Sequence, residues 1–319
     1  MGDLPLLTNN MSNILAVSLA SRVCSLPESL CPSGVWRARI VQLLLALALL
    51  LLAGLALAGW RHLYPVRTEA GWSYATHLDE VEKVSALVED GEGGLLLSQE
   101  LGGGKGRLLR LASGGELSEV QVGLSKPDGM IGFRGGVVFS QEQGELPVLW
   151  RTPDGTRALF VGRSVEGLAS DGRYLYAIED RHGDGSLLRF DPERDVVEVL
   201  RRDLDEAEAV TVCPDGRLFY GEKGKGWIRQ LSADGSDPTV LAGLNQPGFL
   251  LCNDEGLWVS EDATHMARLL LLDQGGQLHT VLSHLRSAQT LIETTPGHYL
   301  LAEQGRNRVL KLQRLATGS

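Results

Sequence analysis

The sequence is poor in cysteine and histidine, the residues from which most zinc sites are built. It has 4 cysteines and 7 histidines among 319 residues, and no cysteine or histidine pair adjoins the acidic candidates described below, which argues against zinc. The glycine-rich run at residues 102–106 lacks the GxxxxGK[ST] spacing and the following helix of a phosphate loop. The formal net charge of −10 repels phosphate backbones. We therefore expect no nucleic-acid partner, and a cation or a small neutral molecule as the ligand.

Long apolar runs are equally scarce, because only residues 40–60 form one, without a single charged side chain. About 20 such residues suffice to cross a hydrocarbon core of ~30 Å, and Trp36 and Trp60 stand at the two ends where interfacial aromatics belong. We predict a single-pass signal anchor. A buried core helix is disfavoured because no other helical segment could surround it. A cleaved signal peptide is disfavoured by the run's length and its late start.

The arginines around this span favour one orientation. Three arginines precede it and two soon follow, so the positive-inside rule favours a cytoplasmic N-terminus and an exported C-terminal part. In a bacterium that part would lie on the periplasmic side of the inner membrane. Residues 1–39, which have no clear periodicity, are expected to be a disordered tail, and residues 61–71 a stem before a globular domain at residues 72–319.

Glycine is abundant, and a six-fold repeat accompanies it. Gly accounts for 39 of 319 residues, above the usual ~7%. Six short apolar runs each end in a glutamate, at intervals of 42, 37, 43, 39 and 42 residues. A period near 40 with several short strands per unit predicts an all-β, six-bladed β-propeller. The repeated glutamates are Glu100, Glu142, Glu179, Glu222, Glu261 and Glu303.

The last repeat predicts how the ring closes. It supplies three strands and then stops, whereas the segment WSYATHL at residues 72–78 resembles the fourth strand of the other units. We predict that this segment completes the sixth blade, which removes the open sheet edges of an unclosed ring.

Two sets of acidic residues are candidates for a site. The repeated glutamates occur once per blade, so we expect them to satisfy backbone amides. The second set lies at the starts of the innermost strands, around the mouth of the central channel, where four carboxylates are followed by Pro247 and Gln289. Converging carboxylates repel one another unless protons or a cation intervene, and Ca²⁺ takes six to eight oxygen ligands. The predicted ligands are Glu82, Asp128, Glu166 and Glu208. The alternative is that they splay into solvent.

The repeat units carry a family resemblance. VEGLASDGRYLYAIED, AEAVTVCPDGRLFYGE and QPGFLLCNDEGLWVSED resemble blades of the SMP-30/gluconolactonase and strictosidine synthase-like propellers, over roughly residues 72–315. The resemblance implies one divalent ion, usually Ca²⁺, held by a Glu, two Asn and an Asp, which activates a lactone or ester carbonyl or a water. This chain has acids where the Asn residues are expected. Virginiamycin B lyase-like propellers share the glutamate after the second strand, but their histidine arrangement is absent.

The resemblance leaves more than one function open. A membrane-anchored, metal-dependent lactonase or esterase is the leading hypothesis, with His182 or His265 as the general base because both lie in mouth-face loops. A non-catalytic propeller that binds a ligand or protein and a metal-free strictosidine synthase-like enzyme are the alternatives.

Cys213 and Cys252 stand at the same place in two consecutive repeats. We expect each to pack as a small apolar side chain. A disulfide between neighbouring blades is the alternative, which depends on the Cα distance.

Overall fold

The computed structural model describes residues 34–63 and 65–315, and the chain divides into two compact units at Arg61/His62. The helix α2 (Gly34–Leu63) is rich in leucine and alanine, the strongest helix formers. Its segment Trp36–Trp60 has a mean hydropathy of 2.8 and is long enough to cross a membrane, and none of it is buried. The helix is therefore not the core of a globular domain, and its length and composition fit a membrane anchor or a signal sequence.

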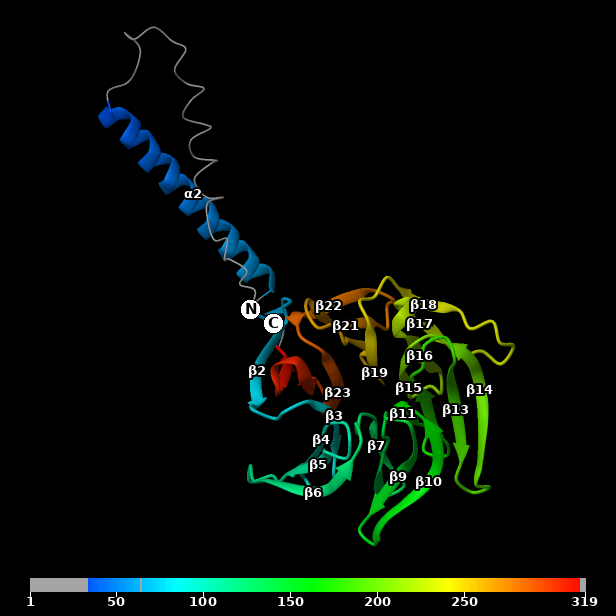
Figure 1. The fold of residues 1–319 in the computed structure, drawn as a ribbon. Coiled ribbons are helices and arrows are strands. Elements are labelled where there is room, and N and C mark those ends of the chain that lie inside the picture. The colour runs from blue at the N-terminus through cyan, green and yellow to red at the C-terminus, as the bar shows by residue number, and fades with distance from the viewer. Residues whose placement is uncertain (1–33, 64, 316–319) are drawn as a thin grey trace, which may run out of the picture. The chain divides into compact units, whose positions relative to one another are not determined.

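The second unit is a six-bladed β-propeller, as the repeat predicts (Figure 1). The first blade contains β3 (Val84–Glu89), β4 (Leu95–Gln99), β5 (Gly106–Leu111) and β6 (Leu117–Leu124). The second contains β7 (Met130–Phe133), β8 (Gly136–Phe139), β9 (Glu145–Thr152) and β10 (Gly155–Arg163). The third contains β11 (Val165–Ser170), β12 (Leu175–Glu179), β13 (Gly185–Asp191) and β14 (Val196–Leu204).

The fifth and sixth blades each include a strand from the N-terminal side of the propeller. The fourth contains β15 (Ala207–Val212), β16 (Leu218–Glu222), the 3₁₀ turn η2 (Lys223–Lys225), β17 (Trp227–Gln230) and β18 (Thr239–Ala242). The fifth contains β19 (Pro247–Asn253), β20 (Gly256–Glu261), β21 (Ala267–Asp273), β22 (Leu278–Leu285) and β1 (Arg67–Thr68). The sixth contains β23 (Ala288–Thr295), β24 (His298–Glu303), the 3₁₀ turn η3 (Gln304–Arg306), β25 (Arg308–Arg314) and β2 (Trp72–Leu78).

Burial follows the position of a strand in its blade. The second strand β4 is buried along its whole length, because neighbouring blades cover both of its faces. The outer strand β6 exposes most of its residues. Apolar runs such as LLLSQ therefore mark inner strands, and the hydrophobic core lies mainly between consecutive blades.

The prediction for ring closure is confirmed. Strand β2 pairs antiparallel with β25, with Trp72 opposite Arg314, and so supplies the fourth strand of the sixth blade. The segment predicted as a stem also contributes to the sheets, because Arg67 of β1 pairs with Ser283 of β22. Trp72 packs against Trp258 and Tyr299, with ring centroids 5.4 and 5.9 Å away. The N-terminal strand is thus fixed by both hydrogen bonds and core packing.

A disulfide joins the fourth and fifth blades. Cys213 and Cys252 are bonded, with Cα atoms 4.9 Å apart and a sequence separation of 39 residues. Both cysteines pack in an apolar cluster, as predicted, and the alternative of a disulfide is also met, because the equivalent positions of two adjacent innermost strands bring the sulfurs together. In the chain-entropy description, closing a loop of this length stabilises the fold by about 4 kcal/mol.

Candidate functional site at the mouth of the central channel

The second residue of each innermost strand, or its equivalent in blade two, forms a ring at the mouth of the channel, here called the inner ring. The register defines it, since Val165 pairs with Glu179, Ala207 with Glu222 and Val84 with Gln99. The inner-ring residues are Ser85, Asp128, Glu166, Glu208, Gly248 and Gln289.

Three of the four predicted metal ligands come together in this ring. Asp128, Glu166 and Glu208 are each at most 5% exposed and line one cavity. Glu82 does not join them. It is exposed, and Ser85 takes the ring position in the first blade. The expectation for Glu82 rested on aligning Glu100 with the other repeated glutamates. Gln99, fourteen residues after Ser85, is the equivalent residue.

Four of the repeated glutamates bind backbone amides, as predicted. Glu179 accepts a hydrogen bond from the Arg163 amide at 2.8 Å, and Glu261 accepts one from the Asn245 amide at 2.8 Å. Glu222 and Glu303 accept equivalent bonds at 3.0 Å. Carboxylates tied to the backbone in this way hold the loops between blades.

In the first two blades a glutamine, Gln99 or Gln141, takes the equivalent position. Gln141 accepts a hydrogen bond from the Ser125 amide at 3.0 Å. Glu100 and Glu142 therefore stand one residue later, at positions that belong to a second ring, here called the outer ring. The sequence signal for this shift is the motif SQE in the first two blades, where the glutamate stands third. In the later blades the glutamate stands second, in the motifs IED, GEK, SED and AEQ. The outer-ring residues are Glu100, Glu142, Asp180, Lys223, Asp262 and Gln304.

A repeated backbone contact positions the outer ring. The Glu142 amide donates to the Lys126 carbonyl at 2.9 Å, and the Asp262 amide donates to the Gln246 carbonyl at 2.7 Å. The same bond occurs in all six blades, and each accepting residue has a positive φ, between 43° and 56°. This left-handed turn starts the innermost strand and directs the outer-ring side chain towards the channel mouth.

The two rings enclose an acidic cavity of about 350 Å³. Eight carboxylates and two lysines line it. Lys126 pairs with Glu142 and, at 3.2 Å, with Glu100. Lys223 Nζ lies 2.6 Å from Glu208 Oε1 and 2.7 Å from Asp262 Oδ2. The lysines neutralise part of the charge, and the cavity keeps a surplus of carboxylates.

Burial and mutual repulsion change the protonation of these acids. Burial raises the pKa of Asp128, Glu166 and Glu208 well above the usual range, and neighbouring carboxylates raise it further. Burial and then repulsion by Glu142 raise the pKa of Asp180 to about 6. Each charge added to this cavity therefore costs free energy unless a cation joins it.

Two carboxylate triads could hold a metal ion. Glu100, Asp128 and Glu142 form one, and Glu142, Glu166 and Asp180 form the other, with ligand oxygens within 4.8 Å of one another in each. Lys126 already pairs with two members of the first triad. In the second, Asp180 Oδ1 is buried without a hydrogen-bond partner among the described residues. An all-oxygen donor set with an unsatisfied member fits a hard cation such as Ca²⁺.

The two predicted histidines lie outside the cavity lining. His182 has an 84% exposed side chain, and its Nδ1 lies 3.1 Å from Asp205 and 3.6 Å from Glu206. Because Glu206 lines the cavity, His182 stands at its rim. His265 is exposed in the loop between β20 and β21.

Comparison with known proteins gives the fold a wider context. No protein-family model and no curated protein sequence matches the chain. A gluconolactonase of Xanthomonas campestris has a similar structure, with a TM-score of 0.65 and 16% identity over 78% of this chain and 95% of that one. This chain shares its propeller fold. The predicted resemblance to gluconolactonase propellers is thereby confirmed at the level of the fold.

Other propellers with this fold do different things. A virginiamycin B lyase of Staphylococcus aureus matches with a TM-score of 0.56 and 13% identity, over 78% of this chain and 94% of that one. A chain of a nidogen/laminin complex matches with a TM-score of 0.54 and 15% identity, over 63% and 83%. A lactonase, a lyase and a chain of a protein complex thus share one propeller architecture. The function of this protein therefore has to be argued from the residues at the mouth of its own channel.

Proposed function

We propose that this protein is a lactone- or ester-hydrolysing propeller that binds one Ca²⁺ ion at the mouth of its channel. The carboxylate triad Glu142, Glu166 and Asp180, with its unsatisfied buried Asp180 oxygen, supports this proposal most strongly. The fold shared with a gluconolactonase supports it at a coarser level. Asp128 stands beside the triad as a fourth oxygen donor.

The chain's own residues would divide the work of hydrolysis. Glu142, Glu166 and Asp180 would hold the Ca²⁺ ion, which would supply Lewis-acid activation of a carbonyl or a water. Lys223, held between Glu208 and Asp262, places a fixed positive charge in the same cavity, where negative charge develops on the substrate oxygen. His182, oriented by Asp205, is the candidate for carrying a proton between the mouth and solvent, and His265 is the second candidate.

A non-catalytic binding propeller is the second candidate function. Lys126 and Lys223 each bridge two carboxylates, so the chain itself neutralises part of the acidic cavity without a metal ion. A propeller of this kind would recognise a cationic or neutral small molecule at the mouth without reacting with it.

The propeller would be displayed outside the cytoplasm by the span at residues 36–60. The Cys213–Cys252 disulfide supports export, because disulfides persist mainly in oxidising compartments. The arginines before the span support the same orientation.

Calcium titration tests the metal proposal. We expect the full-length protein to bind one Ca²⁺ ion in isothermal titration calorimetry, and Glu166→Gln or Asp180→Asn to weaken binding at least tenfold, because each removes a charged oxygen ligand. Asp154→Asn, in an exposed hairpin turn, is the matched control and leaves binding unchanged. A screen of esters and lactones, with and without EDTA, then separates an enzyme from a binding propeller. Absence of Ca²⁺ binding to the wild type would overturn the metal-dependent proposal.

A further inference from the structure

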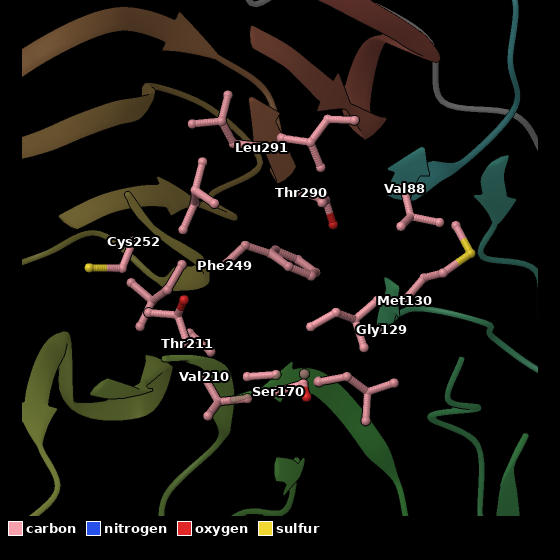
Figure 2. Close-up of a pocket in the computed structure, with 18 of the residues that line it drawn as sticks. Val88, Gly129, Met130, Ser170, Val210, Thr211, Phe249, Cys252, Thr290 and Leu291 are labelled. Atoms are coloured by element: carbon pink, nitrogen blue, oxygen red, sulfur yellow. The ribbon is translucent and has the colours of Figure 1, made fainter. Parts of the chain in front are cut away.

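A second cavity lies below the acidic mouth, along the innermost strands. It has a volume of about 240 Å³ and receives residues from all six blades. Figure 2 shows side chains arranged around an open centre, with the ring of Phe249 pointing into it. The walls are largely aliphatic, formed by residues such as Leu87, Met130, Leu168, Val210 and Leu291. This central channel therefore offers an apolar lining unlike that of the mouth.

The cavity extends along the length of the strands. Glu208 near the start of β15 and Val212 at its end both line it. The polar side chains in the lining are Glu208 and the three hydroxyl residues Ser170, Thr211 and Thr290. A cavity of this shape suits a linear apolar group, because a chain lying along the strands would contact all six blades.

Glu208 is the residue where the apolar channel meets the acidic mouth, since it lines both cavities. Its side chain is only 5% exposed, and its Oε1 accepts the bond from Lys223. Its Oε2 is buried and has no hydrogen-bond partner among the described residues. A buried oxygen without a partner is costly, so a ligand that satisfied it would gain binding free energy.

Gly248 packs closely beside this oxygen. A Cβ at that inner-ring position would lie 3.1 Å from Glu208 Oε2 and 2.9 Å from the Cβ of Asp262. A larger residue at this position would therefore press on Glu208 Oε2, and the glycine keeps this side of the inner ring free of a side chain.

We propose that the central channel binds an alkyl chain whose hydroxyl head group hydrogen-bonds to Glu208 Oε2. A hydroxyl donates to a carboxylate and accepts from a carboxylic acid, so it suits either state of Glu208. At about 30 Å³ for each small group, the cavity has room for roughly eight carbons. The ligand class is thus a medium-chain aliphatic alcohol. Its site is separate from the metal triad, and the proposal does not depend on the proposed hydrolysis.

A series of unreactive 1-alkanols tests this site. The full-length protein in lipid nanodiscs is titrated calorimetrically with ethanol through 1-dodecanol, and empty nanodiscs give the background from partitioning. Burial of each methylene should tighten binding roughly fourfold, up to about eight carbons, after which the affinity levels off.

Two channel variants should move this series in opposite directions. Thr290→Phe narrows the channel and should weaken 1-octanol binding at least tenfold, whereas Phe249→Ala lengthens the space and moves the plateau to longer chains. Thr239→Phe, exposed on the outer strand β18, is the matched control. If Thr290→Phe does not fold, Phe249→Ala alone decides the test.

The outcomes are separate from those of the metal test. The channel site would be overturned if the affinity for alkanols did not depend on chain length, or if both channel variants left that dependence unchanged. This holds whatever the ester and lactone screen shows. A graded series that responds to the variants would support the site even if no ester or lactone is hydrolysed.

Discussion

At the scale of single residues, the propeller contains buried charges that stabilise it as well as charges that repel. Asp237 is one of the stabilising kind, with a side chain 2% exposed. It accepts hydrogen bonds from Arg201 at 2.5 and 2.6 Å and from Tyr220 at 2.7 Å. Burial raises its pKa, but these bonds and one from the Ser232 amide lower it by more, to about 2.

This depressed pKa predicts a pH dependence of stability. The unfolded Asp237 has a pKa near 4, so its contribution is full above that pH and is lost as the pH falls through about 2. Asp237→Asn should destabilise the propeller by about 1–2 kcal/mol at pH 7, allowing for screening by water. Urea unfolding from pH 7 to pH 3 measures the gap in the free energy of unfolding between the wild type and Asp237→Asn. This gap should narrow at the acidic end. A gap independent of pH would contradict the ionic origin of the stabilisation.

The mouth shows which residues the sequence could and could not predict. The six-fold repeat located Asp128, Glu166 and Glu208, because each stands 13 or 14 residues before a repeated glutamate. It misplaced Glu82, since the glutamate of the first blade is shifted by one residue and the neighbouring turn differs in sequence. Asp180 and Lys223 were missed, because only the strand register separates a backbone-binding acid from the residue after it.

At the scale of elements, the closing strand β2 depends on one aromatic contact. Trp72 is 9% exposed and packs between blades five and six, with Trp258 and Tyr299 as its neighbours. Trp258 and Tyr299 also contact each other, with centroids 4.7 Å apart. Edge-to-face and tilted aromatic pairs of this kind add to the free energy gained from burial alone.

Removing this contact should weaken ring closure. We expect Trp72→Ala to lower the free energy of unfolding by about 3–5 kcal/mol, because a large cavity forms in the core beside β25. Thr76→Ala, exposed on the same strand, is the control and should change stability by less than about 0.5 kcal/mol. Denaturant unfolding monitored by tryptophan fluorescence measures both. Equal stability of the two variants would show that β2 is not needed to close the ring.

At the scale of the whole molecule, an apolar helix precedes an acidic propeller that carries a disulfide. The repeat spacing and the incomplete last unit were enough to predict the six blades and their closure. The disulfide could be named only as an alternative, because it depends on the Cα distance between two separate sheets, which the sequence does not give.

The proposed export gives a prediction for the intact chain. An alkaline phosphatase fused after Ser319 should be active in bacterial cells, because that enzyme folds only where disulfides form. On a non-reducing gel the protein should shift in mobility when it is reduced, and Cys213→Ser should abolish that shift. An inactive fusion, with both cysteines open to maleimide without reductant, would place the propeller in the cytoplasm.

The pairing of β2 with β25 also sets an order of events during synthesis. Trp72 leaves the ribosome well before its partner Arg314, which is made 242 residues later. At roughly 5–20 residues per second, the first strand waits on the order of tens of seconds for the last. Five blades can assemble in that time, but the sixth cannot. A nascent chain that stalls before β25 therefore presents an unpaired edge, and only a chain made past β25 can close the ring.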